Sequence, residues 1–134
     1  MIKSDKFTIT GEKDNAFDYF RDLNNFMPLI TGDYVSGHIK NNKEGIIKIK
    51  KTIVTPETNL KVSISKESKE NNPYEIVLKS FESTYNIVIC IYINDLSNGD
   101  YQMIITLENS LMEMFLREST KKFINNILLN FKNK

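Results

Sequence analysis

The side chains that carry out acid–base and nucleophilic chemistry are few in this chain and do not form a catalytic pattern. His38, in the stretch YVSGHIK, is the only histidine, so no other is available for a triad or a two-histidine metal site. If Val35 and Gly37 face the interior of a strand, His38 faces solvent, where a general base has no substrate to act on. Cys90 is the only cysteine, and its apolar neighbours favour a structural role over a nucleophile. We therefore predict no catalytic residue, no metal site and no cofactor.

The remaining polar candidates are carboxylates and phenols. Asp14, Asp18 and Asp22 recur every four residues, and we expect Asp14 to cap a helix and the other two to face solvent. The five glycines are dispersed singly, which argues against a glycine-rich phosphate-binding loop. Four tyrosines are candidates for a hydroxyl inside a pocket, and the sequence leaves open which of them point inwards. These are Tyr34, Tyr85, Tyr92 and Tyr101.

Length and charge limit the class of protein. The 134 residues suit one domain, which we assign to 1–134. The net charge is +1, from 18 basic and 17 acidic residues, so no strong field favours nucleic acid or an anionic membrane. The most apolar segment, 87–93, is too short to span a bilayer. No signal peptide is visible at the N-terminus, so we expect a cytoplasmic protein.

Hydrophobic periodicity predicts the elements that must position these residues. Residues 6–10 alternate as a strand, and 13–30 carry apolar residues at helical spacing, interrupted so as to give two short helices. Six segments rich in β-branched and aromatic residues follow, separated by turn sequences that indicate an antiparallel sheet. These segments are 34–40, 45–54, 59–67, 74–82, 84–94 and 100–108.

Residues 111–131 predict a long amphipathic helix, and its apolar face contains an anomaly. A stripe runs through Met112 and Phe123, yet Ser119 falls at its centre and Thr120 lies beside it. A hydroxyl at that place is explained either by close helix packing with a back-bond to the preceding turn, or by a cavity under the helix.

The order of elements resembles the helix-grip fold of the SRPBCC (START-like) superfamily. The stretch FTITGEKDNAFDYFRDLNNFMPLITGDYVSG is similar to the opening of that family, with Asp22 and the MPLITGD segment in the corresponding places. Among its groups the chain is most similar to the small accessory proteins of carbon monoxide dehydrogenase and to polyketide cyclase-like small proteins. The resemblance implies an α+β fold: a seven-stranded curved antiparallel sheet around a long C-terminal helix, with two short helices after strand 1.

The same resemblance implies a hydrophobic cavity between the sheet and the C-terminal helix, with Ser119 facing it. Aromatic, methionine and aliphatic side chains form its other expected walls, and methionine adapts readily to varied apolar ligands. The expected lining residues are Phe20, Phe26, Met27, Met103, Ile105, Met112, Phe115, Ser119 and Phe123.

Three functions follow as hypotheses. The first is binding of a lipid-, quinone- or polyketide-like small molecule without catalysis. The second is an adaptor for a molybdenum-containing carbon monoxide dehydrogenase-type enzyme, as the resemblance to its accessory proteins implies. The third is a cyclase- or hydrolase-like enzyme, against which the missing catalytic set counts. Both faces of 84–94 are apolar, so we also predict a homodimer or protein-partner contact through that strand.

Overall fold

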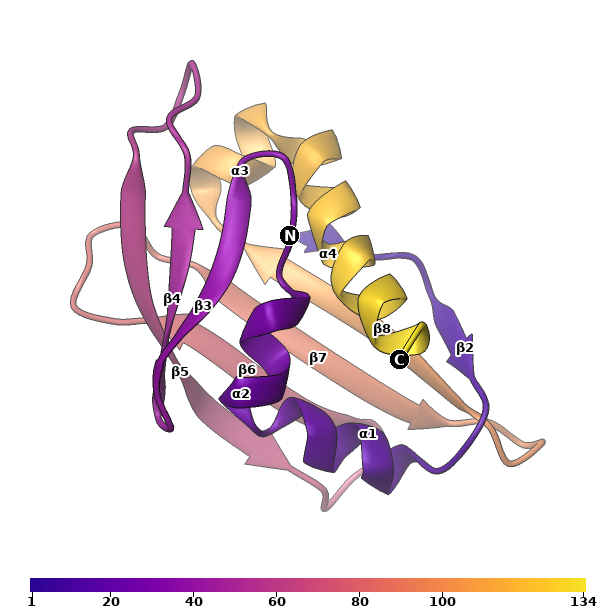
Figure 1. The fold of residues 1–134 in the computed structure, drawn as a ribbon. Helices are drawn as coiled ribbons and strands as arrows, with labels where there is room; N and C mark the ends of the chain where they lie inside the picture. The colour runs from indigo at the N-terminus through magenta and orange to yellow at the C-terminus, as the bar shows by residue number, and fades with distance from the viewer.

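The computed structural model describes the whole chain, residues 1–134, as a curved sheet with helices on its concave side (Figure 1). The strands are β1 (Ile2–Lys3), β2 (Phe7–Ile9), β3 (Val35–Asn41), β4 (Glu44–Ile49), β5 (Thr58–Ser68), β6 (Tyr74–Ser80), β7 (Val88–Asp95) and β8 (Tyr101–Glu108). The helices are α1 (Lys13–Phe20), α2 (Leu23–Phe26), the 3₁₀ turn η1 (Met27–Leu29), α3 (Ser110–Phe115) and α4 (Arg117–Lys132).

The sheet is antiparallel throughout, in the order β1-β8-β7-β6-β5-β4-β3. Both β1 and β2 pair with β8, so the first strand is interrupted and its two parts together occupy one position of seven. Short turns join consecutive strands from β3 to β8, which is the meander that the turn sequences predict. The predicted α+β fold, with its seven-stranded sheet and C-terminal helix, is confirmed.

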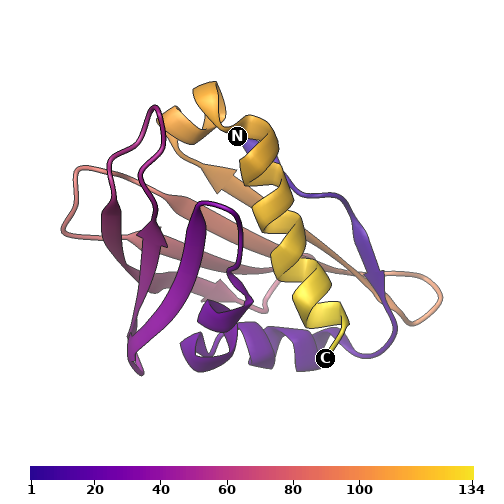
Figure 2. The same ribbon diagram turned by 45° about the horizontal axis from the view of Figure 1, so that its top comes forward.

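The sheet bends around α4, which crosses its concave face diagonally (Figures 1 and 2). Register shifts between Ile64 and Lys66 in β5, and between Ile39 and Asn41 in β3, mark bulges of the kind that increase strand bending. The helices α1 and α2 close the lower end of the concave side in Figure 1.

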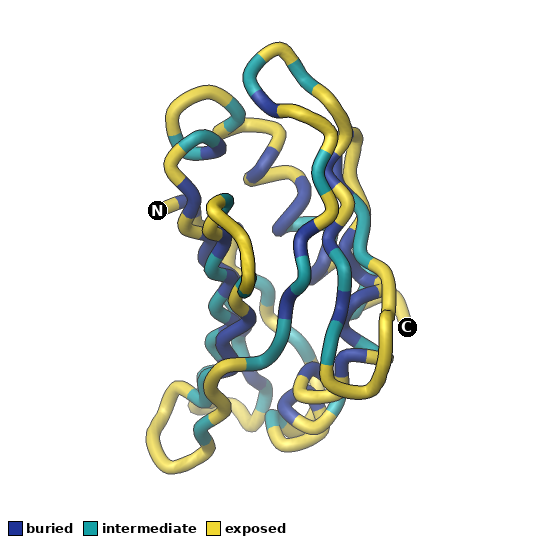
Figure 3. Tube along the Cα trace, turned by 90° about the vertical axis from the view of Figure 1, so that its left-hand side faces the viewer, coloured by how far each residue is buried: buried dark blue, intermediate teal, exposed yellow.

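The core lies between this concave face and the helices, where buried residues concentrate (Figure 3). Alternate residues of β8, Met103, Ile105 and Leu107, are each fully buried, as period-two patterning predicts. Gly45 makes room for one large core side chain, because a Cβ there would lie 2.6 Å from Met27 Sδ. The sheet and the helices contribute to one hydrophobic cluster of 30 buried residues.

The predicted continuous C-terminal helix is broken, and this changes which residues it buries. Leu116 has φ −127° and ψ 30°, outside helical angles, and separates α3 from α4. The Asn109 side chain caps α3 by accepting a hydrogen bond from the Met112 N–H at 3.0 Å. Beyond the break, α4 buries a stripe that begins at Thr120 and includes Phe123 and Ile124.

One capping assignment is also corrected. Asp14 lies inside the first turn of α1 and accepts no capping hydrogen bond; the residue before the helix is Glu12. Asp22 instead caps α2, because its carboxylate accepts from the Asn24 N–H at 2.9 Å. Asp14 and Asp18 are exposed and face Lys69, with N–O separations of 3.7 and 3.9 Å. None of the helices combines the length and the apolar character needed to cross a bilayer.

Candidate ligand-binding site

Most of the expected pocket residues meet in the core between the sheet and α4. Seven of the nine are buried members of the same hydrophobic cluster, contributed by α1, α2, η1, β8, α3 and α4. They are Phe20, Phe26, Met27, Met103, Ile105, Met112 and Phe123. The sequence therefore identifies the residues that would surround a molecule held under α4.

Side chains fill that space in this structure. The rings of Phe20 and Phe26 meet edge to face with centroids 5.5 Å apart, and Phe131 lies 4.8 Å from Phe20. The principal hollows all lie elsewhere, at the surface. One of about 410 Å³ is lined mainly by polar residues, among them Arg21 and Glu67. A ligand under α4 must therefore displace or rearrange core side chains.

Two expected lining residues do not face the core. Ser119 is exposed, and Phe115 is 57% exposed, so their assignment to the pocket is wrong. Both line a shallow surface hollow of about 330 Å³ at the junction of α3 and α4. The physical reason is the break at Leu116, because a wheel drawn through one continuous helix assigns the wrong phase on either side of it.

Thr120 takes the interior position instead and forms a polar contact there. Its side chain is fully buried, and Thr120 Oγ1 shares a hydrogen bond of 2.5 Å with Tyr34 Oη. Tyr34, only 7% exposed, precedes β3 and is held by a hydrogen bond from the Lys50 N–H to its carbonyl oxygen, 2.8 Å long. The edge of the sheet and the first turn of α4 are thus joined by two side-chain hydroxyls.

A third hydroxyl reaches the interior from the loop between β6 and β7. Ser80 Oγ fixes this loop by accepting from the Ile87 N–H at 2.9 Å and donating to the Tyr85 carbonyl at 3.2 Å. Tyr85 packs against the core, and its Oη is buried without any hydrogen-bond partner. Such an orphaned buried hydroxyl is uncommon and calls for an explanation.

Tyr34, Thr120 and Tyr85 together form what we name the hydroxyl cluster. Burial raises the pKa of Tyr85 to about 12, and the proximity of Tyr34 contributes to this rise. Burial also raises the pKa of Tyr34, against the opposing effect of its hydrogen bond with Thr120. No charged side chain contributes to either shift. The cluster is therefore neutral and lies in neutral surroundings at physiological pH.

The other two candidate tyrosines lie outside this cluster. Tyr101, on β8, is 4% exposed, and burial raises its pKa. Tyr92 lies on the convex face of β7 beside the partly exposed Cys90; burial first, and Cys90 second, raise its pKa to about 12. That face also holds Val77 at 7% exposure. The predicted contact between chains through this strand stays a prediction.

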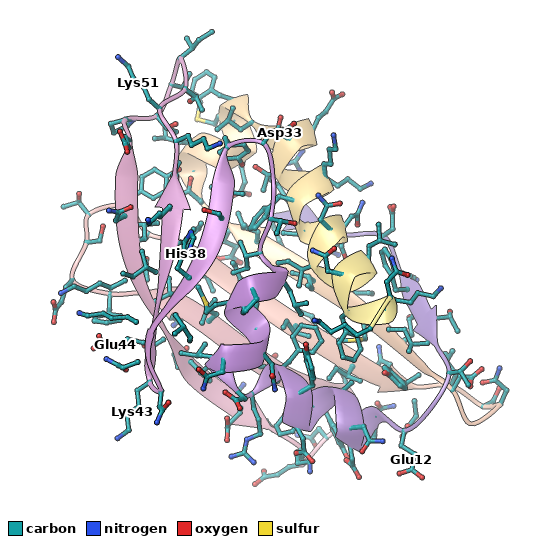
Figure 4. All side chains as sticks on the ribbon, viewed as in Figure 1. Glu12, Asp33, His38, Lys43, Glu44 and Lys51 are labelled. Carbon is teal, nitrogen blue, oxygen red and sulfur yellow. The ribbon has the colours of Figure 1, made fainter.

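His38 points away from the core, as its strand alternation predicts. It lies on β3 (Figure 4), is exposed, and its Nε2 is 2.9 Å from Ser36 Oγ. Nowhere in the chain do three or more histidine, cysteine, aspartate or glutamate side chains gather in a way that could hold a metal ion. The structure thus groups no residues for metal-assisted chemistry.

Comparison with known proteins extends the fold but names no activity. No protein-family model matches the sequence, and no curated protein matches it significantly. A crystal structure from Deinococcus radiodurans matches with a TM-score of 0.67 at 12% identity, over 98% of this chain and 94% of that chain. A hypothetical protein from Sulfolobus tokodaii matches with 0.57 at 16%, over 99% and 89%. A conserved protein from Geobacillus kaustophilus gives 0.60 at 11%, over 96% and 90%. These likenesses establish the fold alone.

Thr120 is the site residue that sequence reasoning missed. Its neighbour Ser119 carries the same chemical group one position, or about 100° of helix rotation, away. The available signal was the spacing of Thr120 from Phe123, Ile124 and Ile127, which is three, four and seven residues.

Proposed function

We propose that this protein binds an apolar small molecule between its sheet and α4, and that it belongs to the SRPBCC superfamily. The likeness to the three crystal structures supports the fold part of this proposal, and the resemblance of the sequence supports the superfamily. The observation that carries the ligand part is the construction of the core beneath the C-terminal helices.

Three methionines line this core where other folds commonly place rigid aliphatic residues. Met27, Met103 and Met112 are each fully buried, and they come from η1, β8 and α3. An unbranched thioether side chain can change rotamer at low cost, so such a core can rearrange around a guest molecule. A core built for stability alone gains more from side chains with one defined rotamer.

The covering helices are also divided where a ligand would enter. The break at Leu116 lets α3 move without unwinding α4, and α3 is a single short helix of six residues. Next to the break, Met114 is 72% exposed and Phe115 is 57% exposed, an apolar pair on the outside of the molecule. Movement of α3 would expose Met112 and open a path to the core.

A matched pair of substitutions tests this function. Met112→Ile keeps an apolar side chain of similar volume but removes its flexibility, so stability should change by less than about 1.5 kcal/mol. The affinity for N-phenylnaphthylamine, an uncharged fluorescent probe, should fall in this variant. Met114→Ile, the same change at an exposed position of the same helix, should leave affinity unchanged.

The outcome against the proposal is equally definite. If the wild-type protein shows no saturable fluorescence change with the probe, or if both variants lose affinity alike, the core under α4 is not the binding site. Native mass spectrometry of the protein from its own host would then be expected to show no retained small molecule. The adaptor and cyclase alternatives have only the sequence resemblance behind them.

A further inference from the structure

The hydroxyl cluster holds more hydrogen-bond donors than its own members can use. Three hydroxyl protons are present, one on each of Tyr34, Thr120 and Tyr85. One proton forms the bond between Tyr34 and Thr120, which makes no second side-chain hydrogen bond, and Tyr85 Oη has no partner. Two donors are therefore unused inside the protein, where a free polar group costs roughly 1–3 kcal/mol.

The cluster is also free of charge. None of the shifts in the phenol pKa values has a lysine, arginine, aspartate or glutamate among its causes. A carboxylate or phosphate brought here would be buried without a counter-ion, which is much costlier than burying a neutral carbonyl. A cationic group would meet only neutral oxygens.

From these two observations we infer that the ligand is an uncharged apolar molecule carrying a carbonyl or equivalent acceptor oxygen, which receives a hydrogen bond from Tyr85 Oη. The Tyr34–Thr120 pair supplies the second donor beside it. This inference rests on the proposed function, because it specifies the polar end of a molecule held under α4. The methionine-lined core accommodates the apolar body.

Three probes of nearly the same shape separate the parts of this inference. Acetylnaphthalene is a neutral ketone, ethylnaphthalene lacks the oxygen, and naphthoate carries a charge, all substituted at the same ring carbon. Their affinities for wild type, Tyr85→Phe and Tyr101→Phe are measured by titration followed by protein NMR. Tyr101→Phe is the control, since Tyr101 is a buried phenol outside the hydroxyl cluster.

In Tyr85→Phe we expect the affinity for acetylnaphthalene to fall about tenfold, the effect of one lost hydrogen bond. Ethylnaphthalene should bind this variant as well as wild type or better. Naphthoate should bind wild type more weakly than the ketone does. The carbonyl stretching band of the bound ketone should lie at lower frequency in wild type than in Tyr85→Phe, which a purely structural role would not produce.

The possible results divide cleanly. If the ketone and the hydrocarbon respond alike to Tyr85→Phe, or if naphthoate binds best, the inference is overturned while the proposed function stands. If none of the probes binds wild type saturably, both fall. Misfolding does not obscure the test, because Tyr85→Phe removes a hydroxyl that makes no hydrogen bond.

Discussion

The hydrogen bond between Tyr34 and Thr120 predicts strongly non-additive effects on stability. Both residues are buried, with exposed fractions of 7% and 0%. Thr120→Val keeps a β-branched side chain of nearly the same shape and helix propensity, but it leaves Tyr34 Oη without a partner. The free energy of unfolding should therefore fall by about 1–3 kcal/mol, the cost of an unsatisfied buried hydroxyl.

Tyr34→Phe should destabilise by a similar amount, because it leaves the Thr120 hydroxyl unsatisfied inside α4. The double variant, with both hydroxyls removed, should lose little more than either single variant, giving a coupling of about 1–2 kcal/mol. Urea unfolding of the four proteins, followed by circular dichroism, measures this cycle. Additive losses, or a loss below about 0.5 kcal/mol for Thr120→Val, would show that the hydrogen bond does not link β3 to α4.

The remaining predictions concern single positions. His38→Ala should change the free energy of unfolding by no more than about 0.5 kcal/mol, because the side chain is exposed; a larger loss in urea would contradict this. Ser119→Leu, also exposed, should neither stabilise the protein nor alter binding of N-phenylnaphthylamine. Tyr92→Lys should shift a dimer towards monomer in sedimentation, and a monomeric wild type would refute the interchain contact. Because burial raises the pKa of Tyr85 from 10.0 to about 12, its neutral form stabilises the fold below pH 10.0 more than its anion would. That contribution belongs to the protonated phenol, so stability measured by urea unfolding should fall as the pH rises from 10.0 to about 12, less steeply in Tyr85→Phe.

The sheet was predictable because its signals are local and repeated. Alternation in segments such as 100–108 fixes which side chains face inwards, and Met103, Ile105 and Leu107 are all buried as expected. Turn sequences between the segments specify the antiparallel order without information from distant residues. Most of the candidate site followed as well, because core position and pocket position coincide in this fold.

The C-terminal helix shows where such reasoning fails. Leu116 is a good helix former, so nothing in the local sequence marks a break there. The break comes from the end of β8, where Asn109 starts α3 while bonded through its side-chain amide to the Asn86 carbonyl at 2.7 Å. The direction of α3 is thus set by the loop before β7 and that of α4 by the sheet. A helical wheel carries no information about either.

The same limitation explains why the polar end of the candidate site was not recognised. Ser119 and Thr120 differ by one position, and only the phase of α4 decides which hydroxyl is buried. Its partner Tyr34 is 86 residues away in the chain, so no local pattern connects the two. The consequence is chemical as well as geometric. A lone serine beside a cavity would offer room for apolar volume, whereas paired hydroxyls next to an unsatisfied phenol offer donors. The feature that distinguishes this interior from an ordinary core is therefore a surplus of hydrogen-bond donors, which an acceptor oxygen of a ligand would satisfy.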